Sequence, residues 1–397
     1  MARRRYLILA NSFVILLVMG ISYAWSIFVG PLEADFGWNR AQTSMAFTLN
    51  LIAFSGGTIL TGILSKRISF TRIIQIGAVM LGTGFLLTTL IQTPWQLYLT
   101  YSLLCGGAVG MCYNAIVSTV PLWFLDNQGV ATGTLIMGYA FSSSILGPVC
   151  HAIITAQGWR AAFVVLAVVN MVILFAGSFL VKVPTGEQLT ALPQPAKAAR
   201  LGKRDFTAGQ MIKTRSFYLY FFYVIILAGV GQVIINHLGP AISQDMGQSA
   251  AFAAGVVSAI SICNGVGRVF WGIVFDKIGT KKTLLVMSAI YTLVLGLVYL
   301  AVVMKAAMLA AVAGCMLLFT YGGNATTIPT ITRKLFGEKH FSMNYSVISL
   351  TNLLAALMPS IAGMMQTSQG NYTMAFLSIV ICSALSIGLA AMMKKED

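Results

Sequence analysis

Charged residues are scarce in this sequence. Asp, Glu, Lys and Arg make up 9% of its 397 residues, whereas an ordinary soluble domain is about 25% charged. Hydrophobic types make up 58%, and the mean hydropathy is +0.85. A soluble protein of this length could not cover its surface with so few charges, which argues against soluble enzymes, nucleic-acid-binding proteins and disordered scaffolds. The composition predicts a chain whose main solvent is lipid.

Paired cysteines and metal-ligand spacings are also lacking. The six cysteines lie in apolar stretches without paired spacing, so neither a disulfide framework nor a zinc site is predicted. No nucleophile stands with a base inside these stretches, which argues against an intramembrane enzyme. We therefore expect no metal, no cofactor and no nucleic-acid partner. The cysteines are Cys105, Cys112, Cys150, Cys263, Cys315 and Cys382.

Long apolar runs are abundant, and each is long enough to cross a lipid bilayer. A spanning helix needs about 20 mostly apolar residues, whereas a membrane β-barrel would show alternating hydrophobicity. The predicted fold class is an all-α membrane protein, with twelve transmembrane helices in two six-helix halves. The expected spans are 6–30, 41–64, 73–91, 95–121, 129–155, 161–181, 215–243, 250–275, 283–303, 306–330, 341–366 and 372–393.

Lysine and arginine outnumber the acids, 25 to 10, and their positions orient the chain. If the N-terminus is inside, the outer loops hold only Arg40, Arg160 and Lys305, and nearly all other basic residues fall on inner segments. Cytoplasmic loops carry an excess of Lys and Arg, so both termini are expected in the cytoplasm. The expected location is a bacterial inner membrane, and a monomer is expected.

A polar, basic segment separates the two halves. Residues 182–214 contain three prolines and are expected to form a cytoplasmic linker. The predicted domains are an N-terminal six-helix half, 1–181, this linker, and a C-terminal six-helix half, 215–397.

The two halves carry a weak internal repeat. Gly62, in the loop after the second span, and Gly272, after the eighth, are 210 residues apart. The same offset pairs Asn114 with Asn324. The matched offset indicates that the two halves are parallel repeats of one six-helix unit.

The loop after the eighth span is expected to form a cytoplasmic clamp. It combines a glycine that closes a helix, an acid, a turn glycine and several bases. The acid could accept hydrogen bonds from helix N-termini or from basic partners. The alternative is that the loop only carries positive-inside charge. The clamp residues are Gly272, Asp276, Lys277, Gly279, Lys281 and Lys282.

Several short motifs are spread over most of the chain. They are Tyr23-Ala-Trp25-Ser26-Ile-Phe28, the stretch Pro31 to Arg40, Ala46-Phe-Thr48, Tyr113-Asn114, Trp123-Phe124, Gly129-Val-Ala131-Thr132-Gly133, Gly138-Tyr139, Asn264-Gly265-Val-Gly267-Arg268 and Gly322-Gly323-Asn324. With these motifs the chain resembles the oxalate:formate antiporter and monocarboxylate transporter branch of the major facilitator superfamily.

This resemblance implies transport of small organic anions by alternating access. The span-8 arginine of that branch binds the carboxylate, and it corresponds here to Arg268. The oxalate-transporting members also have a lysine in span 11, whereas the stretch here is Ser349-Leu-Thr351-Asn352. The missing base favours a monocarboxylate of the lactate, pyruvate or formate class. The alternative is an antiporter of the oxalate:formate type, which exchanges a dicarboxylate for a monocarboxylate.

Arg268 is the only charged residue placed well inside a predicted span. A charge at the centre of a membrane helix costs about 2.5–3.5 kcal/mol on insertion scales. Asp276 lies about 12 Å further along the helix, and Thr58 occupies the repeat position in span 2. A carboxylate ligand, gripped by two parallel hydrogen bonds, would offset this cost. The alternative is structural, with Arg268 bonded to carbonyls or capping another helix.

Other polar residues are candidate contacts of the substrate. Asn264 stands four residues before Arg268, on the same helical face, and either orients the anion or bonds another helix. The remaining candidates could bind carboxylate or hydroxyl oxygens, and the alternative for each is packing with an internal hydrogen bond. They are Tyr23, Tyr113, Asn114, Tyr139, Asn324, Thr351 and Asn352.

No acidic residue stands inside a predicted span to carry a proton. His237, toward the outer end of span 7, is the candidate coupling group because histidine titrates near neutral pH. Otherwise the substrate carboxylate carries the proton, or the protein exchanges anions without protons. A drug exporter would predict a buried acid instead of a buried base, and a membrane sensor would need an added soluble domain.

Overall fold

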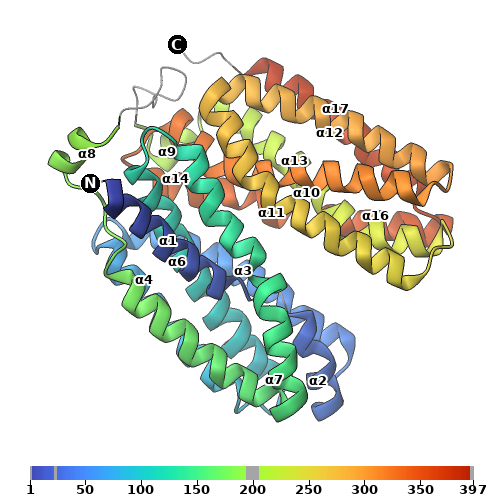
Figure 1. The fold of residues 1–397 in the computed structure, drawn as a ribbon, viewed down its shortest axis with the longest axis horizontal. Coiled ribbons are helices and arrows are strands. Elements are labelled where there is room, and N and C mark those ends of the chain that lie inside the picture. Colours follow the sequence, from blue (N-terminus) through green and yellow to red (C-terminus); the bar gives the residue numbers. More distant parts are fainter. Residues whose placement is uncertain (1, 22–24, 194–204, 394–397) are drawn as a thin grey trace. The chain divides into compact units, whose positions relative to one another are not determined.

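The computed structural model describes residues 2–21, 25–193 and 205–393 (Figure 1). Ten helical segments in these ranges are long and apolar enough to cross a membrane, so the predicted all-α membrane fold is confirmed. The helices are α1 (Ala2–Met19), α2 (Ser26–Phe36), α3 (Arg40–Leu64), α4 (Phe70–Thr88), α5 (Pro94–Leu97), η2 (Tyr98–Cys105), α6 (Gly106–Thr119), η3 (Val120–Trp123), α7 (Gln128–Ser178), α8 (Gly186–Ala191), α9 (Ala208–Met211), α10 (Arg215–Gln244), α11 (Ala250–Ile278), α12 (Thr280–Val303), α13 (Ala307–Phe336), α14 (Phe341–Ser349), α15 (Thr351–Ala355), α16 (Leu357–Gln369) and α17 (Thr373–Met392).

Two of the twelve expected spans share the 51-residue helix α7. Gly158 adopts φ 86° and ψ 166°, which interrupts the helix between the fifth and sixth expected spans. The first expected span, 6–30, corresponds to α1 and α2, and residues 22–24 between them lie outside the described ranges. The expected linker contains the short helices α8 and α9, and its residues 194–204 are also outside the description.

Side-chain caps fix where several of these helices begin. Asn39 precedes α3, accepts the N–H of Gln42 through its side chain at 3.0 Å, and donates its own N–H to the Gln42 side chain at 3.0 Å. Ser249 accepts the N–H of Phe252 in the same way before α11. Such caps satisfy backbone N–H groups that have no partner within the helix.

The helices form two compact units. Unit 1 comprises residues 1–126, 134–194 and 340–347, and unit 2 comprises 127–133, 195–339 and 348–397. Each unit therefore contains most of one sequence half and a short segment from the other half. The segment 127–133 begins α7, and the segment 340–347 contains most of α14.

Close backbone contact joins α3 to α6 in unit 1. A Cβ atom at Gly57 would overlap the carbonyl of Gly107, and one at Gly110 would overlap the carbonyl of Phe54. Glycine at such positions lets two membrane helices approach closely, so that van der Waals contacts hold them where lipid gives no hydrophobic drive.

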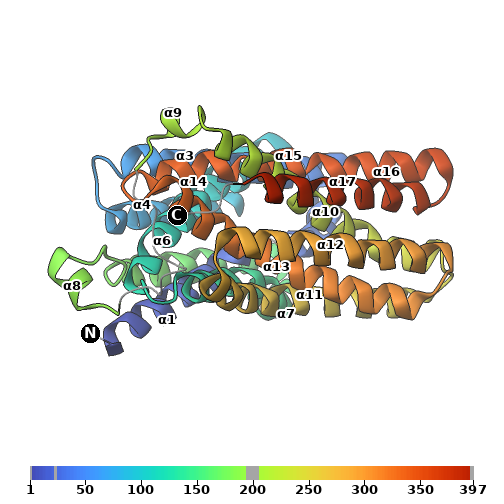
Figure 2. The same cartoon turned by 90° about the horizontal axis from the view of Figure 1, so that it is seen from above.

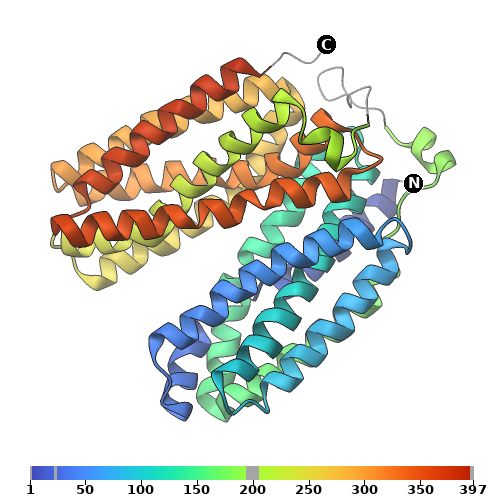
Figure 3. The same cartoon turned by 180° about the vertical axis from the view of Figure 1, so that it is seen from behind.

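Helices α11 and α13 repeat this contact in unit 2, where α11 lies along α13 and α12 lies along α17 (Figures 2 and 3). A Cβ atom at Gly267 would overlap the carbonyl of Phe319, and one at Gly322 would overlap the carbonyl of Asn264. Gly267 is 210 residues after Gly57, whereas Gly322 is 212 residues after Gly110. The internal repeat is thus visible in the packing, with a shift of two residues between the helix pairs.

This shift corrects one of the sequence pairings. Asn114 donates to the carbonyl of Thr58 at 2.8 Å, and Thr326 donates to the carbonyl of Arg268 at 2.9 Å. The structural counterpart of Asn114 is therefore Thr326, and not Asn324. A single offset of 210 missed this because spans 2 and 4 are two residues closer in sequence than spans 8 and 10.

We predict that Gly267→Ala destabilises the protein by about 1–3 kcal/mol, because the new methyl group would overlap backbone that cannot move aside. The matched control is Gly255→Ala on the same helix, where no atom lies within 4 Å of the new Cβ. That change should be neutral or stabilise by about 0.5–1 kcal/mol. Thermal unfolding in detergent measures both. Equal melting temperatures for the two variants would contradict the role given to Gly267.

Candidate functional site

Arg268 is half-buried in the second half of α11. Its Nε atom lies 3.4 Å from Oδ1 of Asn264, one helical turn earlier. This distance is long for a charge-assisted hydrogen bond, which is usually 2.7–2.9 Å. The Asn264 amide oxygen therefore lies beside Nε and favours one orientation of the guanidinium.

The backbone around Arg268 is held by two neighbouring helices. From α13, the Thr326 hydroxyl donates to the Arg268 carbonyl. From α7, Gly133 packs so closely that a Cβ atom there would overlap the same carbonyl. These contacts fix the position of the α11 backbone at Arg268. The direction of the side chain depends on the contacts of the guanidinium itself.

One and two turns beyond Arg268, the same face of α11 contacts the start of α7. Gly272 and Gly129 approach so closely that a Cβ atom on either would overlap the backbone of the other. The buried Asp276 carboxylate accepts the N–H groups of Gly129 and Val130 at 2.9 and 3.0 Å. A carboxylate at this position satisfies unpaired N–H groups and interacts favourably with the helix dipole. Arg268, Gly272 and Asp276 are spaced at i, i+4 and i+8, so they lie in line.

The remaining predicted clamp residues lie at the turn from α11 to α12. Gly279 ends α11 with φ 75°, a conformation that residues with a Cβ rarely adopt. Lys281 donates to the carbonyl of Ala391 in the last turn of α17 at 2.9 Å, where a cation is favourable. Lys277 and Lys282 are exposed.

In unit 1, Tyr113 and Tyr139 belong to an aromatic cluster. The ring centroids of Phe54 and Tyr113 are 5.5 Å apart, and those of Tyr113 and Tyr139 are 5.3 Å apart. Phe54 is the repeat counterpart of Asn264, and Thr58 is the counterpart of Arg268. Unit 1 thus has aromatic and neutral side chains where unit 2 has an amide and a guanidinium.

Asn114 is fully buried, and its amide is engaged by protein partners. Its Nδ2 atom bonds Thr58 and the α14 residues Ser342 and Ser346, and its Oδ1 atom accepts from Ser118 and Ser342. In this structure the groups that were expected to bind substrate join three helices.

The other predicted contacts differ in their surroundings. Asn324 is 2% exposed, and within the described ranges its Oδ1 atom has no hydrogen-bond partner. Thr351 is buried and donates to the carbonyl of Ile348 at 2.6 Å, whereas Asn352 is exposed. Tyr23 lies outside the described residues.

His237 lies in α10 against the second half of the expected span 11. Its Nε2 atom is 2.8 Å from the carbonyl oxygen of Pro359, and its ring centroid is 5.4 Å from that of Tyr372. A carbonyl oxygen only accepts hydrogen bonds, so Nε2 carries a proton and donates in this contact.

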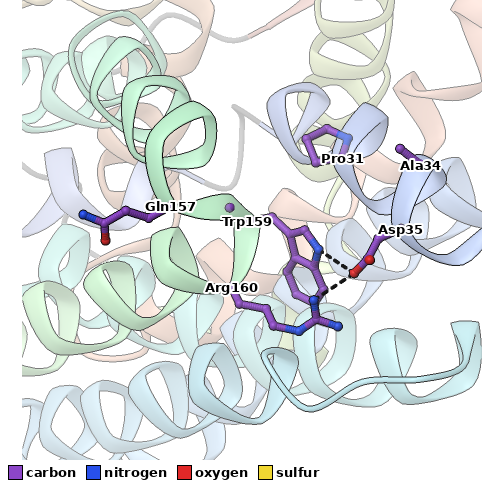
Figure 4. A pocket seen from close by; sticks show the side chains of 7 residues that line it. Pro31, Ala34, Asp35, Gln157, Trp159 and Arg160 are labelled. Carbon is purple, nitrogen blue, oxygen red and sulfur yellow. Dashed lines mark hydrogen bonds and ion pairs between the residues drawn. The ribbon is translucent and has the colours of Figure 1, made fainter.

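Sequence reasoning missed a second polar cluster, which lines a cavity of about 440 Å³ in unit 1 (Figure 4). The Asp35 carboxylate accepts from Trp159 Nε1 at 3.0 Å and from Arg160 at 2.8 Å, and the Arg160 guanidinium lies 4.2 Å from the Trp159 ring centroid. Pro31 and Gln157 also line the cavity. No local signal reveals this cluster, because its two sides are more than 120 residues apart.

Comparisons with known proteins agree with this architecture. Residues 12–363 match the model of the Major Facilitator Superfamily. The chain is 27% identical over 390 residues to the oxalate:formate antiporter of Oxalobacter formigenes, covering 97% of this chain and 90% of that protein. It is 23% identical over 425 residues to monocarboxylate transporter 12 of Homo sapiens, covering 98% and 81%. Its fold is similar to that of the Major Facilitator Superfamily transporter FucP in a crystal structure of the outward conformation, with a TM-score of 0.72, 14% identity, and 99% of this chain and 100% of that chain covered.

The helices and their repeated packing define an integral membrane protein built from two related units. The match over most of the chain makes the assignment specific: this protein belongs to the Major Facilitator Superfamily. It is therefore a secondary transporter and not an enzyme, and the expected membership of this superfamily is confirmed.

The Asp35 cluster predicts a pH-dependent contribution to stability. Hydrogen bonds from Trp159 and Arg160 hold the pKa of Asp35 below its ordinary value. A carboxyl of this kind stabilises the fold above its unfolded-state pKa, about 3.9. The contribution is lost as the pH falls through the lower pKa of the folded state. We expect Asp35→Asn to lower the melting temperature at neutral pH. The melting temperature of this variant should also fall less steeply than that of the wild type as the pH is lowered.

The control for this prediction is Glu187→Gln, at a carboxylate of the exposed helix α8. It should leave the pH profile of the melting temperature unchanged. An Asp35→Asn profile that runs parallel to that of the wild type down to acid pH would contradict the prediction.

Proposed function

We propose that this protein transports a small monocarboxylate of the lactate, pyruvate or formate class by alternating access, with Arg268 binding the carboxylate. The observation that supports this most directly is the position of Arg268 within α11, beside Asn264 and one turn from the contact with α7. The names of the two relatives point to the same chemistry, since one exchanges oxalate and formate and the other transports monocarboxylates.

Guanidinium suits this task better than an ammonium group. It stays protonated at all physiological pH values and presents parallel N–H donors that match the two oxygens of a carboxylate. The Asn264 side-chain oxygen lies on one side of Nε and favours one orientation of the Arg268 guanidinium. A bound anion would also neutralise a charge that is costly inside a membrane.

The same helix connects this charge to the start of α7. Arg268, Gly272 and Asp276 lie along one face of α11, and the last two contact Gly129. A rigid helix transmits a small tilt at Arg268 directly to these contacts. In the proposed cycle, anion occupancy neutralises Arg268 and allows the two halves to rock, as in transporters built from repeats.

The preference for one carboxylate rests on the middle of the expected span 11. Thr351 and Asn352 offer a hydroxyl and an amide there but no cation. A dianion such as oxalate would find no second cation in this stretch to pair with its second carboxylate. The alternative, oxalate:formate antiport, is supported by the relative from Oxalobacter formigenes.

Proton coupling has one candidate in unit 2. His237 could exchange a proton at Nδ1 while Nε2 holds the Pro359 carbonyl. The other routes are a proton carried by the substrate itself and anion exchange without protons. We further propose that the protein lies in a bacterial inner membrane with both termini in the cytoplasm. We also propose that it is a monomer.

Uptake of labelled carboxylates into proteoliposomes tests this function. The panel should contain formate, lactate, pyruvate, oxalate and a neutral sugar, each measured with and without a pH gradient and with and without internal anion. Uptake driven by the pH gradient identifies symport, and uptake that needs internal anion identifies exchange. Transport of the sugar, with no uptake of any carboxylate, would refute the proposal.

We predict that Arg268→Lys lowers transport efficiency about 10- to 100-fold, because one charge-assisted hydrogen bond worth about 1.5–3 kcal/mol is lost while the positive charge remains. The matched control is Arg72→Lys at the exposed start of α4, which should transport normally. Initial uptake rates at several substrate concentrations measure both. Normal kinetics of a correctly inserted Arg268→Lys variant would exclude Arg268 as the anion ligand.

We further predict that Thr351→Lys shifts the preference toward dicarboxylates, because it adds a second cation in the expected span 11. The ratio of oxalate to formate uptake should rise at least about tenfold, the equivalent of one modest ionic contact. Ser368→Lys, at an exposed position of α16, is the control. An unchanged ratio would show that the missing base does not set the preference.

A further inference from the structure

Residues 341–347 of α14 belong to the second sequence half but pack in unit 1. They contact α3 and α6. Met343 packs against Gly62 so closely that a Cβ atom at Gly62 would lie 2.9 Å from the Met343 Cα atom. Ser346 donates to the carbonyl of Thr58 at 2.6 Å. The start of α14 is therefore attached to a unit other than the one that contains the rest of its span.

Asn114 is the centre of this attachment. Its Nδ2 atom carries two N–H groups and lies within hydrogen-bond distance of three acceptors: the Thr58 carbonyl at 2.8 Å, the Ser346 hydroxyl at 2.9 Å and the Ser342 carbonyl at 3.1 Å. Its Oδ1 atom accepts from Ser118 at 2.8 Å and from Ser342 at 3.2 Å. One amide thus joins α3, α6 and α14, and every member is buried, so that loss of the amide would leave several polar atoms without partners.

Unit 2 shows that the fold does not need this amide. Thr326 occupies the position of Asn114 and makes one bond to the corresponding carbonyl of Arg268. The corresponding partner from the other half is Gly133, which has no side chain to donate. Two helix pairs of the same geometry are therefore joined to their third helix by different means: unit 1 uses an amide and serine hydroxyls, and unit 2 uses glycine contacts and the Asp276 carboxylate.

The helical segments that carry the two serines continue past the border between the two units. The segments α14, α15 and α16 meet at Leu350 and Ala356, which keep helical backbone angles of φ −60°, ψ −21° and φ −65°, ψ −12°. The border between the two units falls at Val347 and Ile348, inside α14. The start of α14 is therefore continuous with helical segments that belong to unit 2.

We propose that Asn114 is a positioning residue of the transport cycle, whose amide latches the start of α14 onto α3 and α6 and whose release lets the start of α14 move away from them. It acts through α14 and does not touch the substrate. The proposal rests on the alternating-access part of the proposed function, because rocking of the two sequence halves must separate residues 341–347 from α3 and α6. It is independent of which anion is carried.

The test is the reactivity of a cysteine introduced by Met343→Cys, next to the latch. Inside-out membrane vesicles without any substrate are treated with a maleimide, and labelling of the native cysteines is subtracted using protein without Met343→Cys. We expect Asn114→Ala to raise the labelling rate about 3- to 10-fold, the factor that corresponds to losing a net hydrogen bond or more. Asn114→Thr introduces the residue of unit 2 and should give a smaller rise.

Asn170→Ala is the matched control. Asn170 is also a fully buried asparagine of unit 1, but its amide donates only to Leu166 of its own helix, at 2.9 Å. Its labelling rate should stay within about twofold of the wild type. In uptake assays, Asn114→Ala should change the maximal rate while the half-saturating concentration moves less than about threefold, unlike in Arg268→Lys.

An unchanged labelling rate in Asn114→Ala, with weakened substrate affinity, would overturn the proposal and make Asn114 a substrate ligand. If Asn114→Ala fails to insert, Asn114→Thr and Ser346→Ala decide, because each removes part of the network and leaves the helix packing intact. Labelling is measured without substrate, so failure of the carboxylate assignment and failure of the latch give different results.

Discussion

Close backbone packing of α11 against its neighbours is the constraint on which the rest of the structure depends. Lipid offers membrane helices no hydrophobic drive to associate, so contact must come from shape and from hydrogen bonds. Gly267 and Gly322 bring α11 against α13, and Gly129 and Gly272 bring it against α7. A helix held this firmly can carry a charged side chain at a defined position, which a loosely packed helix could not, and it passes any displacement at Arg268 to its ends.

The two units use one packing scheme for different chemistry. In both, a hydroxyl or an amide from the fourth helix of the half bonds a carbonyl of the second helix. At the position of that carbonyl, unit 2 has Arg268 and unit 1 has Thr58. The partner from the other half is glycine in unit 2 and serine in unit 1. The same place in the repeat thus carries a cation in unit 2 and a neutral side chain in unit 1, which repeated packing permits because the glycine contacts between the helices are made by the backbone.

Much of this architecture could be predicted from the sequence, because lipid imposes simple rules. Apolar run length located the helices, and a lone arginine within a run marked the charged position. The contacts of the polar residues in unit 1 could not be predicted from the sequence. Asn114 looked like its repeat partner Asn324, yet its contacts depend on Ser342 and Ser346, more than 200 residues away. The offset of 210 could not show that the fourth helices are shifted by two residues, since that shift appears only in which carbonyl each side chain reaches.

Residues 127–133 and 340–347 each pack in the unit that contains most of the other sequence half. The free energy needed to separate them from their contacts differs between the two segments. At the start of α7, the Asp276 carboxylate satisfies two N–H groups, so separation would strip a buried charge of its partners. At the start of α14, the partners of Asn114 are neutral, and separation would leave neutral donors and acceptors that water can satisfy. Unpairing a buried charge costs more than unpairing a neutral group. The start of α14 is therefore held by the weaker kind of contact, and we expect it to separate before the start of α7 does.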